Sequence, residues 1–130
     1  ALGLVRVLAA GALTRGCAGE RMAEIGLMSE AGAAFFTDGD RTVVNSRTLQ
    51  RVMSYAAAFD ALIAVRPVEP WLGEGAVATS GDAAAWSGLA SVPALAERIQ
   101  LDRDLALAEL TGGRLLIDLI STEAALESLD

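Results

Sequence analysis

The chain has 130 residues with 17 acidic and 10 basic side chains, no histidine, and a formal net charge of −7. Without histidine the sequence excludes a Ser-His-Asp triad, a Cys-His pair and an imidazole zinc ligand of its own. The acidic balance argues against nucleic acid as a partner, and no apolar run is long enough to span a membrane. The single cysteine, Cys17, cannot form an internal disulfide, which fits a reducing compartment such as the cytoplasm.

Short apolar segments alternate with helical patterns along the chain. The apolar segments predict four strands, at residues 4–10, 33–36, 62–65 and 115–120. Helical spacing predicts helices over residues 20–31, from Ser46 as N-cap to Phe59, over roughly 94–110, and after Ser121 or Thr122. Strands alternating with helices indicate a parallel α/β sheet. Four such units fit either a small doubly wound sheet or half of an eight-unit barrel.

Residues 67–92 lack a clear period and are rich in Pro, Gly, Ser and Ala. We therefore expect one long loop inside a single domain that covers residues 1–130. Trp71 and Trp86 lie in this loop, and we expect them to pack it onto the domain; the alternative is that they anchor a partner.

Other polar residues have unremarkable expected roles. In the 94–110 helix the acidic residues alternate with arginines, which predicts a solvated face of mixed charge, formed by Glu97, Arg98, Asp102, Arg103 and Asp104. Cys17 has no helper nearby other than Arg15, so a buried, inert thiol is expected.

Five segments in chain order carry a recognisable pattern. Three of them are contiguous: AFFTDG at 34–39, RPVEPWL at 66–72 and TGGRLLIDLIST at 111–122. The other two are spaced: ALTRG at 12–16 is followed by Gly-Glu at 19–20, and Gly-Leu at 88–89 is followed by Pro93, Ala-Glu at 96–97 and Arg-Asp at 103–104. This series resembles the dihydroorotase family, whose corresponding motifs are AFTDDG, HPEDPxL and TGARxHxxHVST. The resemblance covers essentially the whole chain in one register.

The resemblance implies a fold and a chemistry. The family fold is a (β/α)8 barrel of the amidohydrolase type, so the chain is expected to be α/β, a partial TIM-type barrel of about four consecutive βα units. The family cyclises carbamoyl-aspartate reversibly to dihydroorotate, with zinc at the carboxyl ends of the strands. On this reading residues 1–130 are the central part of a longer barrel.

The sequence departs from the family at the metal positions. Gly39 stands for the second Asp of DDG, Arg66 for the histidine of HPEDP, and Leu116 and Leu119 for the two histidines of HxxH. A guanidinium cannot ligate a cation, and leucine has no lone pair to offer. We therefore expect no catalytic, cofactor-binding or metal-ligating residue in this segment, and no zinc.

Three carboxylates could form a residual polar site. Asp38, Asp40 and Asp118 lie near the degenerate positions, and we expect Arg66 to pair with one of them. The alternative is that Arg66 binds an anionic ligand. Asp38 and Asp40 are expected to be turn residues or arginine partners rather than catalytic acids.

The leading hypothesis is a catalytically inactive dihydroorotase-like protein of pyrimidine biosynthesis in the cytoplasm. The resemblance implies a scaffolding role, such as supporting the assembly of aspartate carbamoyltransferase, or self-association. The alternative is an active metal-dependent hydrolase of cyclic amides whose ligands lie mainly outside this segment, and a third hypothesis is small-molecule sensing through Arg66. Four strands of a barrel leave two open edges, so we expect the isolated segment to be marginally stable.

Overall fold

The structure, a computed structural model, describes residues 4–129; residues 1–3 and 130 of the predicted domain lie outside it. Twelve elements follow one another along the chain: β1 (Ala10–Gly11), the 3₁₀ turn η1 (Arg15–Cys17), α1 (Ile25–Glu30), β2 (Phe35–Phe36), α2 (Ser46–Ala57), β3 (Leu62–Val65), β4 (Ala78–Thr79), α3 (Asp82–Trp86), β5 (Ser91–Val92), α4 (Leu95–Thr111), β6 (Arg114–Ile117) and α5 (Glu123–Leu126). None of the helices described is long and apolar enough to cross a membrane.

The main sheet has four strands in the order β1-β2-β3-β6, all parallel. Each strand lies beside the one before it, and α1, α2 and α4 make the connections. A doubly wound sheet would reverse its strand order, whereas steady addition in one direction is the arrangement of a barrel. The fold is therefore a partial (β/α)8 barrel with four βα units, as predicted.

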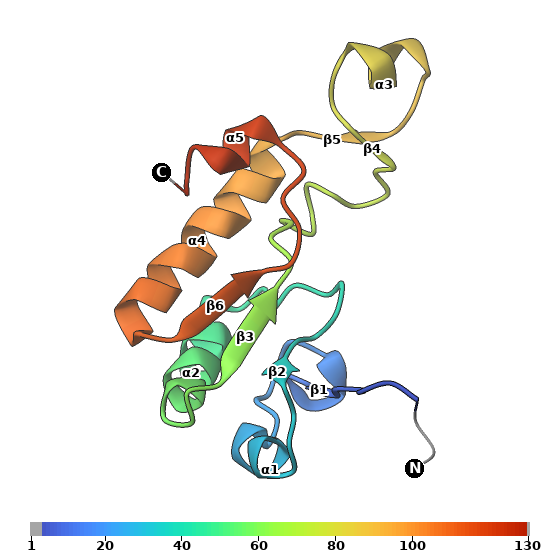
Figure 1. The fold of residues 1–130 in the computed structure, drawn as a ribbon. Helices are drawn as coiled ribbons and strands as arrows, with labels where there is room; N and C mark the ends of the chain where they lie inside the picture. Colours follow the sequence, from blue (N-terminus) through green and yellow to red (C-terminus); the bar gives the residue numbers. More distant parts are fainter. Residues whose placement is uncertain (1–3, 130) are drawn as a thin grey trace.

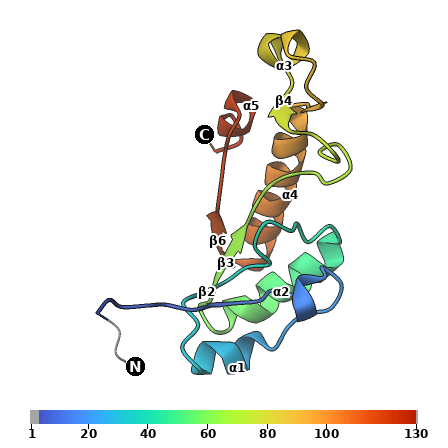
Figure 2. The same cartoon turned by 90° about the vertical axis from the view of Figure 1, so that its right-hand side faces the viewer.

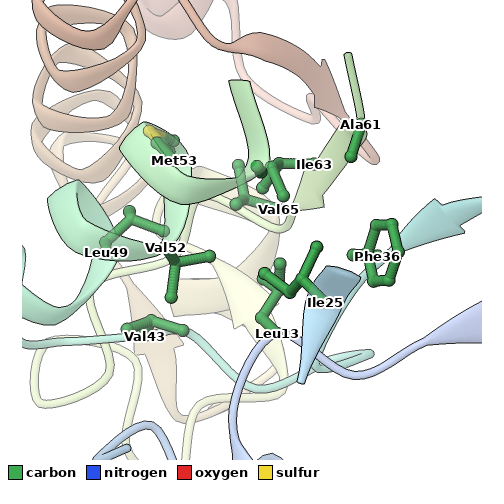
Figure 3. Packing of buried hydrophobic residues seen from close by; sticks show 11 residues of the cluster. Leu13, Ile25, Phe36, Val43, Leu49, Val52, Met53, Ala61, Ile63 and Val65 are labelled. Atoms are coloured by element: carbon green, nitrogen blue, oxygen red, sulfur yellow. The ribbon is translucent and has the colours of Figure 1, made fainter. Parts of the chain in front are cut away.

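The helices cover one face of the sheet. α1, α2 and α4 lie on the same side of the strands in Figure 2, and the opposite side carries no helix layer. The core between them gathers the buried apolar side chains of α2 and β3, with Leu49, Val52, Met53, Ile63 and Val65 at its centre (Figure 3). On β6, Leu115 and Ile117 pack against this core, so Leu116 faces the opposite side and is 44% exposed.

Two predicted elements, the strand at 4–10 and the helix at 20–31, are shorter in the structure. The predicted strand at 4–10 is wrong for most of its length: only Ala10 and Gly11 pair, and Leu4, Val5, Val7 and Leu8 are exposed. β1 lies at the sheet edge beside a two-residue strand, so no ladder extends to these residues. The helix predicted from residue 20 starts at Ile25 because the preceding backbone turns back on itself, with Arg15 N donating to Arg21 O at 2.8 Å.

Helix ends follow the sequence signals closely. Gly32 and Gly112 follow α1 and α4 with φ of 94° and 64°, the left-handed conformation that ends helices. The N-cap of α2 is Asn45 rather than the predicted Ser46, because the Asn45 side chain accepts hydrogen bonds from Arg47 N and Thr48 N. The predicted long loop at 67–92 contains β4, α3 and β5, which together form a small excursion beyond the end of β3 (Figure 1).

Candidate functional site at the carboxyl ends of the strands

The carboxyl ends of β3 and β6 carry an ion pair. Val65 and Ile117 are partners in register, so the next residues, Arg66 and Asp118, face each other across the strand ends. Arg66 Nη2 and Nε donate to Asp118 Oδ2 at 2.8 and 3.2 Å. Because side chains alternate along a strand, this pair lies on the face opposite to the core, where a barrel has its interior. Of the three predicted carboxylate partners, Asp118 is the one Arg66 uses.

Asp38 has a structural task in the loop after β2. It is buried, and it accepts hydrogen bonds from the backbone N–H groups of Leu13 and Thr14 at 2.9 and 3.0 Å and from the Thr14 hydroxyl. The same Thr14 oxygen accepts from Gly19 N at 2.8 Å. The carboxylate therefore joins the loops that follow β1 and β2, which agrees with the expectation of a loop residue.

The other degenerate positions offer no ligand to a cation. Gly39 has a φ of 72°, in the left-handed region that glycine adopts without strain. Leu116 and Leu119 are 44% and 52% exposed at the end of β6. Asp40 is exposed and lies in the loop beyond Gly39.

A zinc ion does not fit this set of residues. The guanidinium of Arg66 places a permanent positive charge at the strand ends, and its partner Asp118 is already engaged. Within residues 4–129, no three His, Cys, Asp or Glu side chains gather so that they could hold a metal ion. Thiolate, imidazole and carboxylate donors are what zinc requires, and it usually takes four ligands.

A pocket of about 410 Å³ lies beside the strand ends. The loops after β1, β2 and β3 line it, with Cys17, Asp40, Arg41, Thr42 and Val68 among the residues. Burial and the nearby Asp38 carboxylate raise the pKa of the Cys17 thiol, which keeps it protonated at neutral pH. Cys17 is half-buried rather than fully buried, and the inert thiol expected from sequence is consistent with this pKa.

The prediction that Glu97 lies on a solvated face is wrong. Glu97 is 7% exposed and points from α4 to the loop after β6. Four donors reach its carboxylate: Ser121 N at 3.0 Å, Thr122 N at 3.0 Å, Thr122 Oγ1 at 2.8 Å and the Ser121 hydroxyl. Burial alone would raise the pKa of Glu97, but these hydrogen bonds outweigh it and lower the pKa.

The prediction of a solvated position is also wrong for Asp104, on the same helix. It is fully buried and pairs with Arg103, whose guanidinium also donates to Val44 O at 2.8 Å. Burial raises the pKa of Asp104, although Arg103 and Gln100 act against this. Asp102 and Arg98 keep the expected solvated positions, with side chains 52% and 40% exposed and 3.8 Å apart.

The signal for this buried polar stripe was present in the sequence. Glu97, Gln100 and Asp104 follow each other at helical spacing, in phase with the buried Leu101. A pattern that assigns every charge to solvent misses a face on which polar groups are buried because they are hydrogen-bonded.

The two tryptophans do not pack the excursion onto the domain. Trp71 is 68% exposed and Trp86 is 91% exposed. The expectation of packing is therefore wrong for both side chains in the described residues.

Comparison with known proteins shows sequence relatives along nearly the whole chain. A dihydroorotase of Syntrophobacter fumaroxidans is 39% identical over 127 residues, which are 98% of this chain and 29% of the relative. A dihydroorotase of Desulfotalea psychrophila is 40% identical over 124 residues, 95% of this chain and 30% of the relative. A dihydroorotase-like protein of Pseudomonas aeruginosa is 38% identical over 112 residues, 86% of this chain and 26% of the relative. The chain thus spans less than a third of the length of these relatives.

A solved structure supports the architecture. The L-hydantoinase (dihydropyrimidinase) of Arthrobacter aurescens superposes with a TM-score of 0.64 and 23% identity, over 92% of this chain and 28% of that one. At this identity the likeness concerns the fold alone, and it agrees with the partial barrel. No family model matches the chain.

Proposed function

The chain is dihydroorotase-like in sequence along nearly its whole length, and we propose that it contributes barrel structure, not chemistry, to a dihydroorotase-like protein of pyrimidine biosynthesis. The observation that carries this proposal is the Arg66–Asp118 ion pair at the facing ends of β3 and β6. In the family these strand ends would present histidines to zinc. Here they present a guanidinium, a carboxylate bonded to it, and two leucines.

The departures from the family motifs include the ligand positions, whereas side chains that order the strand ends are present. Asp38 still ties together the loops after β1 and β2, and Glu97 still holds the loop after β6. Residues that pack the strand ends are therefore present, while residues that would bind the metal are replaced. This is the pattern expected when the barrel is required and its hydrolytic reaction is not.

The role that follows is structural. We propose that the protein acts in the cytoplasm as a non-catalytic scaffold, and that its partner is aspartate carbamoyltransferase, with self-association as the other route to an assembly. The support is the family resemblance together with the retained packing of the strand ends. The open sheet edges at β1 and β6 add a physical reason for the segment to require further structure around it.

Metal content and turnover of the complete protein test the proposal. We expect zinc well below one equivalent by inductively coupled plasma mass spectrometry, and no interconversion of carbamoyl-aspartate and dihydroorotate. Arg66→Leu is the matched variant, since it removes the positive charge without adding a ligand, and it should leave both readouts unchanged. Stoichiometric zinc with turnover would instead establish the alternative, an active hydrolase of cyclic amides whose ligands lie mainly outside this segment.

The scaffold role has a separate test. Sedimentation velocity of the complete protein mixed with aspartate carbamoyltransferase should show a complex larger than either component. If no complex forms and the protein alone is monomeric, the scaffold role fails while the absence of catalysis stands.

A further inference from the structure

Residues 77–92 form a protrusion, which we call the α3 tip. β4 and β5 pair at its base, with Val77 N donating to Ala90 O at 2.9 Å and Ser80 N to Val92 O at 2.8 Å. α3 closes the far end, where Leu89 N donates to Ala84 O at 3.0 Å. Between positions 81 and 91 only Ala84 is buried. In Figures 1 and 2 the tip projects beyond the ends of β3 and β6.

The tip presents its largest apolar side chain to solvent. Trp86, at the end of α3, is 91% exposed; Val77 is 73% and Leu89 48% exposed. All three come from one short segment folded on itself by backbone hydrogen bonds, so the presentation of the indole costs little ordering on binding. Tryptophan is one of the side chains enriched at the hot spots of protein interfaces.

The charge around the tip has one sign. No basic residue occurs between Arg66 and Arg98, whereas Glu69, Glu74 and Asp82 all lie in this stretch. Glu74 and Asp82 are exposed, and the whole chain has a net charge of −7. A complementary surface would therefore be basic and would offer an apolar pocket to the indole.

We propose that the α3 tip is a docking surface for a partner protein that inserts Trp86 into an apolar pocket bordered by arginine or lysine. The partner's cations face Asp82, which lies one turn before Trp86 on α3, and Leu89, which folds back onto α3, borders the indole. This site is separate from the strand ends, so it does not depend on whether they bind metal.

Other occupants fit the tip less well. A second copy of the chain would bring one acidic surface against another, and an anionic lipid surface would repel it, because the stretch holds no basic residue. Strands that continue the barrel would add at the edges β1 and β6, and if their loops covered the tip, the complete protein would not bind the probe described below.

A defined probe tests the surface on the complete protein. A fluorescein-labelled amphipathic helical peptide of leucine and arginine supplies the proposed chemistry, and a leucine–glutamate peptide of the same pattern is its control. Fluorescence anisotropy should show binding of the arginine peptide, weakened about tenfold or more by Trp86→Ala. The other exposed tryptophan provides the matched variant: Trp71→Ala should leave the affinity unchanged. Asp82→Asn should weaken binding and flatten its salt dependence.

Four outcomes would overturn the proposal. The first is absence of peptide binding, and the second is equal affinity of the wild type and Trp86→Ala. The third is equal binding of the glutamate peptide. The fourth is a different occupant: self-association in sedimentation velocity, or binding to phosphatidylcholine–phosphatidylglycerol vesicles, that Trp86→Ala abolishes while Trp71→Ala does not.

Discussion

Replacing Glu97 by glutamine should loosen the loop after β6. The substitution keeps the size and planar shape of the side chain but turns one acceptor oxygen into an NH₂ donor. The carboxylate receives hydrogen bonds from two backbone N–H groups and two hydroxyls, all from Ser121 and Thr122. Oε1 accepts from both backbone N–H groups and from the Thr122 hydroxyl, whereas Oε2 accepts from the Ser121 hydroxyl and shares the Ser121 N–H. An amide oxygen at the Oε1 position keeps three of these bonds, and the amide nitrogen then faces the Ser121 donors.

The magnitude follows from the weakening of the hydrogen bonds to the side chain. Hydrogen bonds to a charged group contribute about 1.5–3 kcal/mol each, and the hydroxyls can rotate to become acceptors. The loss is then the charge on the three retained bonds, about 1 kcal/mol for each, or about 3 kcal/mol in total. If this free energy acts on the loop after β6 alone, it raises the equilibrium constant for local opening of that loop by a factor of about 100.

Amide hydrogen exchange measures the effect directly, because the Ser121 and Thr122 N–H groups are themselves donors to Glu97. Both amides should exchange about 100 times faster in Glu97→Gln than in the wild type. Asp102→Asn is the control on the same helix: its carboxylate is exposed and only 3.8 Å from Arg98, so the two amides should be unaffected.

The pH dependence of this contact has a definite sign. The folded pKa of Glu97 is lowered, so the contact contributes stability at neutral pH and loses it as pH falls below the ordinary glutamate pKa of about 4.3. Wild-type protection of the two amides should therefore fall on acidification, whereas the glutamine variant should show no such step. Equal exchange in Glu97→Gln and Asp102→Asn would refute the assigned role of Glu97.

Two further predictions concern packing and a buried acid. In Gly11→Ala the new Cβ would lie 2.6 Å from the Phe36 ring, so the free energy of unfolding in urea should fall by about 1–3 kcal/mol. Gly81→Ala is the control, because open space surrounds Gly81 and the free energy of unfolding should change little. Equal effects of the two substitutions would contradict the packing argument. Because the pKa of Asp104 is raised, its contribution to stability decreases as pH rises above the ordinary aspartate pKa of about 3.9, which is the reverse of Glu97. Arg103→Leu should steepen this decrease, because Arg103 lowers the pKa of Asp104, and urea unfolding at a series of pH values measures it. An unchanged slope in the variant would contradict the assigned role of Arg103.

The sequence predicts the architecture well because its signals are local and repeated. The four strands follow from apolar runs, and α2 from the helical spacing that buries Leu49, Val52 and Met53. Strand length is less predictable: residues 4–8 are largely apolar, but the ladder of β1 with β2 covers only Ala10 and Gly11 at the sheet edge. The length of a strand depends on how many backbone partners its neighbouring strand offers, and the hydrophobic period of the sequence does not carry that information.

The site was predictable in part. That Arg66 would find a carboxylate follows from its charge, but the choice of Asp118 depends on the register of β3 with β6, which places the two residues opposite each other. The burial of Glu97 depends on where α4 crosses the loop after β6. Helix–loop crossings of this kind join residues far apart in the chain, and charge patterning alone assigns such residues to solvent.

The ion pair also gives a physical account of how the strand ends stay together without a metal. A metal ion bound by neighbouring strands is a crosslink between them. Arg66 and Asp118 join the same two strands with a charge-assisted pair, although it is only partly buried and contributes about 0–1 kcal/mol. Such a pair is too weak to hold the strand ends alone, but the backbone joins them directly, with Asp118 N donating to Val65 O at 2.9 Å, and Glu97 holds the loop that follows β6. Structural integrity at this edge therefore no longer depends on the positions that would carry the chemistry.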